Sequence, residues 1–197
     1  MNKIILHGII RNIEYSHTIK DINFYKAELL VNRGNGKEDL INIKFKQFSN
    51  IYNENQDIYL IGNIRTYSQR LQDKNKVDTY VFTYFDIPEE DNIDNQCEVD
   101  GRVCKQGILR RTKSGKDVID FILANNIVSE NNQILNVYIP CVAWGKLAKQ
   151  IAKYKTGDNI SLTGQLQSRE YKKLINDKDY EIRITHELNI TGIKDEI

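Results

Sequence analysis

One strand-like segment combines side chains that build a core with rings that can stack on other flat rings. In Asn136–Trp144, aliphatic and small side chains occupy every second position, which predicts a buried face. The opposite face carries Tyr138, Pro140, Val142 and Trp144. An exposed aromatic ring gives an unpaired base a flat surface, and each stacked base contributes about 1–3 kcal/mol whatever its identity. The alternative is that Trp144, the only tryptophan, fills the core beneath the helix that follows.

Basic side chains gather at turns on either side of this segment. One group surrounds the Ser114-Gly115 turn, and a second follows the strand-like run that contains Gly164. Lys and Arg bind the backbone of nucleic acids through charge, so both groups are expected to contact phosphates. Their members are Arg110, Arg111, Lys113, Lys116, Arg169, Lys172 and Lys173. Hairpin tips that are charged only because they are solvated are the alternative.

A related segment in the first half of the chain is more basic and has fewer rings. In Leu40–Phe48 the corresponding face carries Asn42, Lys44, Lys46 and Phe48. Two lysines stand where the other segment has apolar residues. We therefore expect Lys44 and Lys46 to bind phosphates and Phe48 to supply a single stacking ring. A solvated sheet edge is the alternative.

The elements that must position these residues occur twice in the same order. Each half has five strand-like runs, which predicts an internal duplication, with Leu40–Phe48 and Asn136–Trp144 as the third strands. Glycines recur at matching places inside the runs, as expected where a strand bends around a small barrel and a side chain would clash. They are Gly8, Gly62, Gly101 and Gly164.

The duplication predicts an all-β chain of two tandem five-stranded OB-fold barrels. We expect domains at residues 1–88 and 96–193, joined by an acidic linker at residues 89–95. Only one short helix is predicted, over Gly145–Gly157, where apolar residues share one face and lysines the other. It lies between strands three and four of the second barrel. In the first barrel the equivalent spacer is shorter, so at most one helical turn is expected.

The composition argues against a binding mechanism based on overall charge. The 197 residues include 28 Lys and Arg against 27 Asp and Glu, a net charge of +1. Any nucleic-acid binding must therefore come from local placement of charges and rings. No segment resembles a membrane span or a secretory signal, and Cys97, Cys104 and Cys141 form no CxxC pair. A cytoplasmic, nucleoid-associated protein with reduced thiols and no membrane partner is expected.

No arrangement of residues points to catalysis. His7, His17 and His186 are isolated and lack metal-ligand spacing, so neither a metal nor a cofactor is expected. The run ending at Lys116 has the last residues of a phosphate loop, but Arg110 stands where the first glycine should be. We therefore expect a protein that is not an enzyme.

The second half resembles the bacterial single-stranded DNA-binding proteins of replication and repair. The matching residues include Gly101-Arg-Val, Cys141-Val-Ala-Trp-Gly-Lys-Leu-Ala148 and Gly164-Gln-Leu-Gln-Ser-Arg-Glu-Tyr171, each at its expected distance. The resemblance covers about residues 96–193, and the first half shares it only through the repeat. It implies barrels that bind single strands without sequence preference. Tyr138, Trp144 and Tyr171 match the family's stacking positions, and Arg102 is expected among the phosphate contacts.

These features together predict a protein that binds and protects single-stranded DNA in replication, recombination or repair. Two barrels per chain predict a homodimer that presents four. Replication or repair proteins are further expected partners, although the family's acidic tail has no counterpart here. Two alternatives are an accessory replication or mobile-element protein that acts through protein contacts, and an RNA-binding OB protein.

Overall fold

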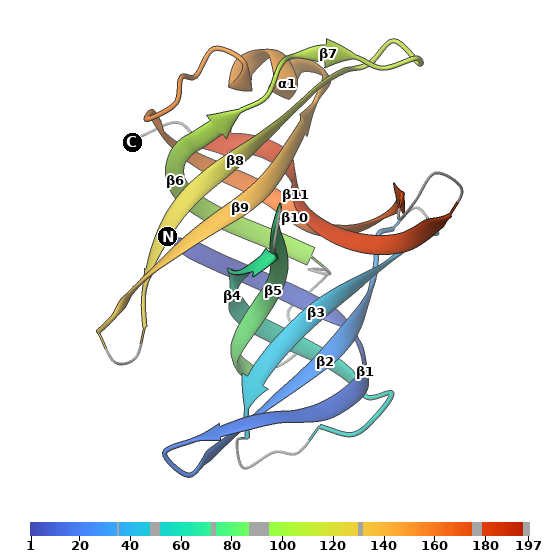
Figure 1. The fold of residues 1–197 in the computed structure, drawn as a ribbon, viewed down its shortest axis with the longest axis vertical. Coiled ribbons are helices and arrows are strands. Elements are labelled where there is room, and N and C mark those ends of the chain that lie inside the picture. Colours follow the sequence, from blue (N-terminus) through green and yellow to red (C-terminus); the bar gives the residue numbers. More distant parts are fainter. Residues whose placement is uncertain are drawn as a thin grey trace.

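Strands make up most of the computed structural model, which describes residues 1–34, 36–47, 52–71, 74–86, 95–129, 132–174 and 179–194 (Figure 1). The first half contains β1 (Asn2–Ile19), β2 (Ile22–Asn32), β3 (Glu38–Lys46), β4 (Asp57–Leu71) and β5 (Lys74–Asp86). The second contains β6 (Asn95–Gln106), β7 (Arg110–Arg111), β8 (Asp117–Val128), β9 (Ile134–Trp144), α1 (Gly145–Ile151), β10 (Asn159–Leu174) and β11 (Tyr180–Lys194).

Each half closes into a barrel by the same set of strand pairings. In the first, β1 pairs with both β2 and β4, and a short parallel pairing of β3 with β5 completes the ring. In the second, β6 pairs with β8 and β10, and β9 meets β11 in parallel. The prediction of two tandem five-stranded OB barrels is confirmed. The two-residue β7 is an addition to the hairpin before β8.

Alternating side chains fill both barrels, and glycines allow the strands to curve around them. Ile4 and Leu6 in the first barrel and Leu162 and Leu188 in the second are fully buried. Burial of such a side chain contributes about 1.5–3 kcal/mol. A Cβ on Gly101 would lie 2.5 Å from the carbonyl oxygen of Ala124, and the other three predicted glycines meet a partner-strand carbonyl in the same way. The expected clash is therefore confirmed.

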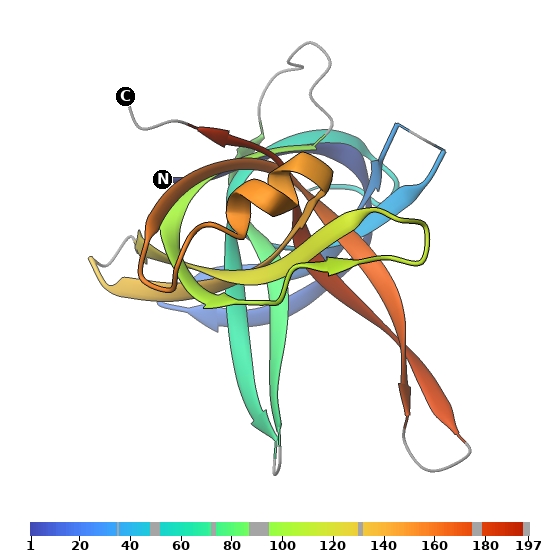
Figure 2. The ribbon, with the colours of Figure 1, turned by 90° about the horizontal axis from the view of Figure 1, so that it is seen from above.

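The two barrels join through one continuous sheet. Strand β1 pairs antiparallel with β6, from Asn2 opposite Val99 to Leu6 opposite Asn95. The Asn95 side chain also pairs with β10 as a neighbouring strand would. Its Nδ2 donates to the Leu166 carbonyl oxygen at 2.6 Å, and its Oδ1 accepts from the Leu166 backbone N–H at 3.0 Å. Asn95, expected in the linker, therefore belongs to β6, and the remainder of the expected linker lies outside the described residues. Figure 2 shows that the β4–β5 and β10–β11 ribbons project from the same side of the molecule.

Matching strand pairings in the two barrels fix which residues are equivalent. The carbonyl that faces Gly8 belongs to Leu30, which pairs with Leu40, and the one that faces Gly101 belongs to Ala124, which pairs with Tyr138. Leu40 therefore corresponds to Tyr138, and six residues on, Lys46 corresponds to Trp144. The sequence alignment placed Phe48 opposite Trp144 and was wrong by two residues. An even shift keeps the same face, so the predicted side of the strand was right.

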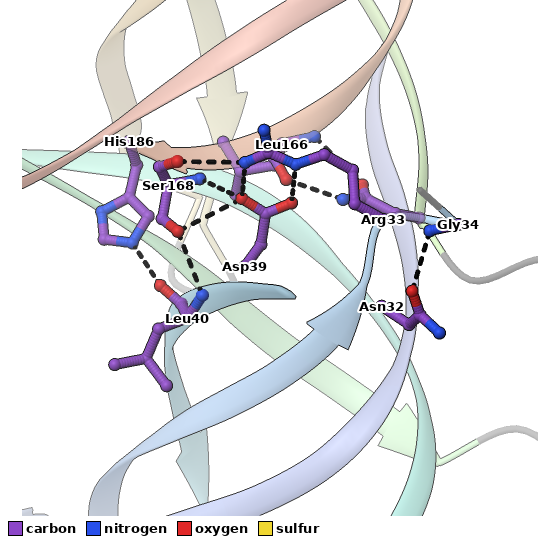
Figure 3. Close-up of polar contacts among 9 residues, drawn as sticks. Asn32, Arg33, Gly34, Asp39, Leu40, Leu166, Ser168 and His186 are labelled. Carbon is purple, nitrogen blue, oxygen red and sulfur yellow. Dashed lines mark hydrogen bonds and ion pairs between the residues drawn. The ribbon is translucent and has the colours of Figure 1, made fainter. Parts of the chain in front are cut away.

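A buried polar cluster locks the first barrel's β2–β3 hairpin against the second barrel (Figure 3). Arg33 forms an ion pair with the fully buried Asp39, whose Oδ1 accepts hydrogen bonds from the Ser168 amide at 2.6 Å and its hydroxyl at 3.2 Å. The Leu40 amide donates to Ser168 Oγ at 3.1 Å, and His186 Nε2 donates to the Leu40 carbonyl at 2.7 Å. These five residues, the inter-barrel lock, hold the base of the β10–β11 ribbon on β3.

The single helix is shorter than the sequence predicts. It spans Gly145–Ile151, with Ala148 and Ile151 buried, and tight turns continue the chain to Gly157 at a φ of 101°. In the first barrel, residues 52–56 form a turn and no helix. No helix in the described part of the chain is long and apolar enough to cross a membrane.

Candidate nucleic-acid interface

The outer face of β9 exposes the two rings that strand alternation predicts. Tyr138 and Trp144 are 44% and 43% exposed, whereas Val137 and Ile139 are buried inside the barrel. The alternative in which Trp144 fills the core is therefore wrong. Val142, also expected to face outward, is only 4% exposed, so other side chains cover the outer face at that position.

Trp144 remains on the outer face because β9 ends abruptly there. Its own backbone is extended, with φ −124° and ψ 151°. The next residue, Gly145, has a φ of 58°, in the left-handed region that favours glycine. This conformation turns the chain directly into α1, so the tryptophan belongs to the strand and not to the helix.

Each exposed ring has an arginine two strands away on the same face. Strand register aligns Arg102 with Ala124, and Ala124 with Tyr138, across β6, β8 and β9. Neighbouring strands lie about 4.8 Å apart, so the backbones of Arg102 and Tyr138 are separated by about 10 Å. At this separation the long Arg102 side chain can reach the phosphate of a nucleotide stacked on Tyr138, and its Nε at present donates to Asn159 Oδ1 at 3.0 Å.

A second row of the same kind contains Trp144. Arg110, Val118 and Trp144 are aligned across β7, β8 and β9. Trp144 follows Tyr138 by six positions along β9, which is about 20 Å of strand. The two rows form an extended surface, suited to several nucleotides and not to one small ligand.

The hairpin between β6 and β8 contributes four cations, two of which contact other groups of the chain and two of which extend into solvent. Arg110 forms an ion pair with Asp120, and Arg111 Nε donates to the Gly115 carbonyl at 2.9 Å. Lys113 and Lys116 are exposed at the same hairpin. A phosphate would therefore compete with Asp120 for Arg110, whereas the two lysine side chains already point into water.

The third predicted ring lies on the β10–β11 ribbon beyond the barrel. Tyr171 is 37% exposed and stands opposite Arg183. It shares a face with Arg169 and Lys173, because residues two apart in a strand point the same way. Arg169 lies 3.4 Å from Glu187. Lys172 is on the reverse face, with its Nζ 4.3 Å from the Tyr180 ring centroid, so the predicted basic cluster is divided between two faces.

The first barrel carries a groove of about 270 Å³ on the equivalent face. Lys44 and Lys46 line it, whereas Phe48 lies outside the described residues. Other residues that line the groove were not predicted from the sequence, among them Phe24, Arg65, Tyr80 and Phe82. Alternation in β5 was the available signal. Thr79 and Val81 face the core, so Tyr80 and Phe82 belong to the outer face of the strand.

Burial changes the ionisation of two groups in this groove. It lowers the pKa of Lys44, nearby Lys26 lowers it further, and Asp78 partly opposes both effects. Burial also raises the pKa of Tyr80, with Arg65 acting in the opposite direction. A phosphate beside Lys44 would restore the stability of its charged form.

Tandem OB barrels whose outer strands expose rings flanked by cations define a class of single-strand-binding architecture. The sequence profile of the single-strand binding protein family matches residues 94–191. The second half of this chain is therefore similar to the single-strand binding protein family along nearly its whole length.

Individual relatives agree with this placement. The single-stranded DNA-binding protein of Staphylococcus epidermidis is 34% identical over 82 residues, which cover 40% of this chain and 62% of that protein. The protein of the same name from Enterococcus faecalis is 36% identical over 75 residues, covering 36% of this chain and 40% of its own length. The matches thus span less than two thirds of these relatives.

A solved structure extends the likeness in fold to the first half. The wild-type single-stranded DNA binding protein from Thermus aquaticus superimposes with a TM-score of 0.73, covering 100% of this chain and 93% of that chain. Sequence identity is 17%, so the comparison shows the shared two-barrel fold.

Proposed function

We propose that this protein binds single-stranded DNA without sequence preference and protects it during replication, recombination or repair. The observation that carries the proposal is the pair of exposed rings on β9, Tyr138 and Trp144, each with an arginine two strands away. Duplex DNA hides the faces of its bases, whereas a single strand offers them to the rings. The match of residues 94–191 to the single-strand binding protein family supports the same conclusion.

In this proposal the strand is held by two kinds of contact, stacking on bases and ionic contacts with phosphates. Tyr138, Trp144 and Tyr171 stack on bases, which is tolerant of sequence because every base has a flat face. Exposed cations, Lys113 and Lys116 among them, bind phosphates and release counterions, which makes the affinity fall as salt rises. The near-neutral chain binds through this local arrangement and not through its overall field.

Fluorescence anisotropy with a labelled oligo-dT tests the role of the rings. Trp144→Ala and Tyr138→Ala are each expected to weaken binding roughly 5- to 150-fold, the loss of one stacked base. Tyr59→Ala is the matched control, since Tyr59 stacks on His7 on the outer face of β4, with ring centroids 3.9 Å apart. The proposal is wrong if all three variants bind like the wild type, or if the control loses as much affinity as the others.

Assembly and location are parts of the proposal with their own support. A homodimer would present four barrels, and the two barrels in each chain support this number. Static light scattering at micromolar protein should then give twice the chain mass of 23.0 kDa. We place the protein in the cytoplasm with the nucleoid DNA, a location that suits three cysteines that form no disulfide.

A further inference from the structure

The groove of the first barrel is chemically unlike its counterpart in the second. Lys44 pairs with Phe82, and the equivalent pair in the second barrel is Val142 with Asn189. Lys46 occupies the position of Trp144. The first barrel also lies outside the residues that match the family profile. The ligand of this groove is therefore determined by its own side chains.

The rings of this groove are covered by cationic or ionisable groups of the same chain. Lys44 Nζ lies 4.2 Å from the centroid of the Tyr80 ring, and Arg65 Cζ lies 3.9 Å from that of Phe82. Both arrangements are cation–π contacts. A third ring, Phe24, is stacked on His17 at 4.8 Å with an interplanar angle of 3°. One face of each of these rings is thus covered before any ligand arrives.

A nucleic-acid strand carries both partners that these groups need. Its bases can replace the cations on the rings, and its phosphates can accept the cations that are displaced. A ligand with only rings would remove the cation–π contacts of Lys44 and Arg65, whereas the hydrogen bond from Arg65 Nε to Asn63 Oδ1 at 2.9 Å can remain. A ligand with only phosphates would leave the rings uncovered. Lys46 adds a cation on the same face of β3, two residues from Lys44.

We infer that the first barrel holds a second single-strand site, which opens when a strand takes the rings of Tyr80 and Phe82 and the displaced Lys44 and Arg65 move to its phosphates. This inference rests on the proposed function and adds a separate site with its own mode of entry. The exchange makes Lys44 both a cover for the ring and a ligand for phosphate.

The double role of Lys44 gives a salt dependence that neither role alone produces. In Lys44→Met the ring is uncovered and one phosphate contact is lost. The slope of log Kd against log[salt] should therefore fall by about one. The two curves should cross, with the variant weaker at low salt and as tight as the wild type, or tighter, at high salt. Lys194→Met is the control, since Lys194 pairs with Glu98 of the second barrel at 2.7 Å, and its slope should not change.

A relocated fluorophore separates failure of this inference from failure of the proposed function. In the full chain carrying Trp144→Phe and Tyr80→Trp, the introduced indole reports on the first barrel alone. Labelled oligo-dT should bind, and the indole emission should change in step with the anisotropy. Binding with a silent indole, or a Lys44→Met curve parallel to that of the wild type, would overturn the second site and leave the proposed function intact. Absence of any binding by the wild-type chain would overturn both.

Discussion

Replacing Asp39 with alanine should lower the free energy of unfolding by about 3 kcal/mol. Asp39 is fully buried, pairs with Arg33 and accepts two hydrogen bonds from Ser168. Removing one partner of a buried ion pair costs about 3–5 kcal/mol, because the other charge is left without compensation. The Arg33 side chain is 22% exposed and can gain water, so we expect the lower end of this range.

Equilibrium urea unfolding followed by circular dichroism measures this loss. Asp39→Asn keeps an acceptor oxygen for Ser168 and should fall between wild type and Asp39→Ala. Glu14→Ala is the control, because its ion pair with Lys26 joins side chains that are 61% and 54% exposed, and such pairs contribute about 0–1 kcal/mol. If Asp39→Ala loses less than about 1 kcal/mol, like the control, the inter-barrel lock does not stabilise the fold.

Three further predictions concern pH, packing and charge. Burial lowers the pKa of His186 below its ordinary 6.5, so the unfolded chain takes up the proton first. Stability is then greatest above about pH 6.5 and falls below it, by up to about 1.4 kcal/mol per pH unit; urea unfolding from pH 7.5 to 5 should show this slope, reduced in His186→Gln. Gly101→Ala places a Cβ 2.5 Å from the Ala124 carbonyl and should cost about 1–3 kcal/mol, which a urea midpoint equal to that of the wild type would contradict. Lys113→Gln with Lys116→Gln should lower the slope of log Kd against log[salt] by about 1.4 in a titration with oligo-dT, and an unchanged slope would mean that neither lysine contacts phosphate.

Strand alternation was enough to find the exposed rings, because it is a local property. Successive side chains of a strand point to opposite faces, so the buried Ile139 implies an outward Tyr138 whatever the rest of the chain does. Alternation assigns each side chain to a face of its strand, but it does not fix which residues of the two halves are equivalent. That is why Leu40–Phe48 was aligned two residues away from its true match while its lysines were still assigned to the correct side.

The features that the sequence did not predict depend on contacts between distant strands. The groove of the first barrel combines Phe24 from β2, Lys44 from β3, Arg65 from β4 and Tyr80 from β5. Only closure of the barrel brings these residues together. The inter-barrel lock likewise joins residues 33–40 to residues 168–186, and His186 looked like any isolated strand histidine. Nothing in the local pattern marks Asp39 as a buried partner of the other barrel.

Intrinsic fluorescence of Trp144 is the most direct test of the central claim, since it is the chain's only tryptophan and lies on the surface proposed to stack on bases. The wild-type chain should be titrated with oligo-dT, a matching duplex and oligo-U at two salt concentrations. We predict saturable quenching by oligo-dT that weakens as salt rises, and little change with the duplex. Unchanged emission with oligo-dT, or equal quenching by the duplex, would contradict single-strand stacking on the outer face of β9.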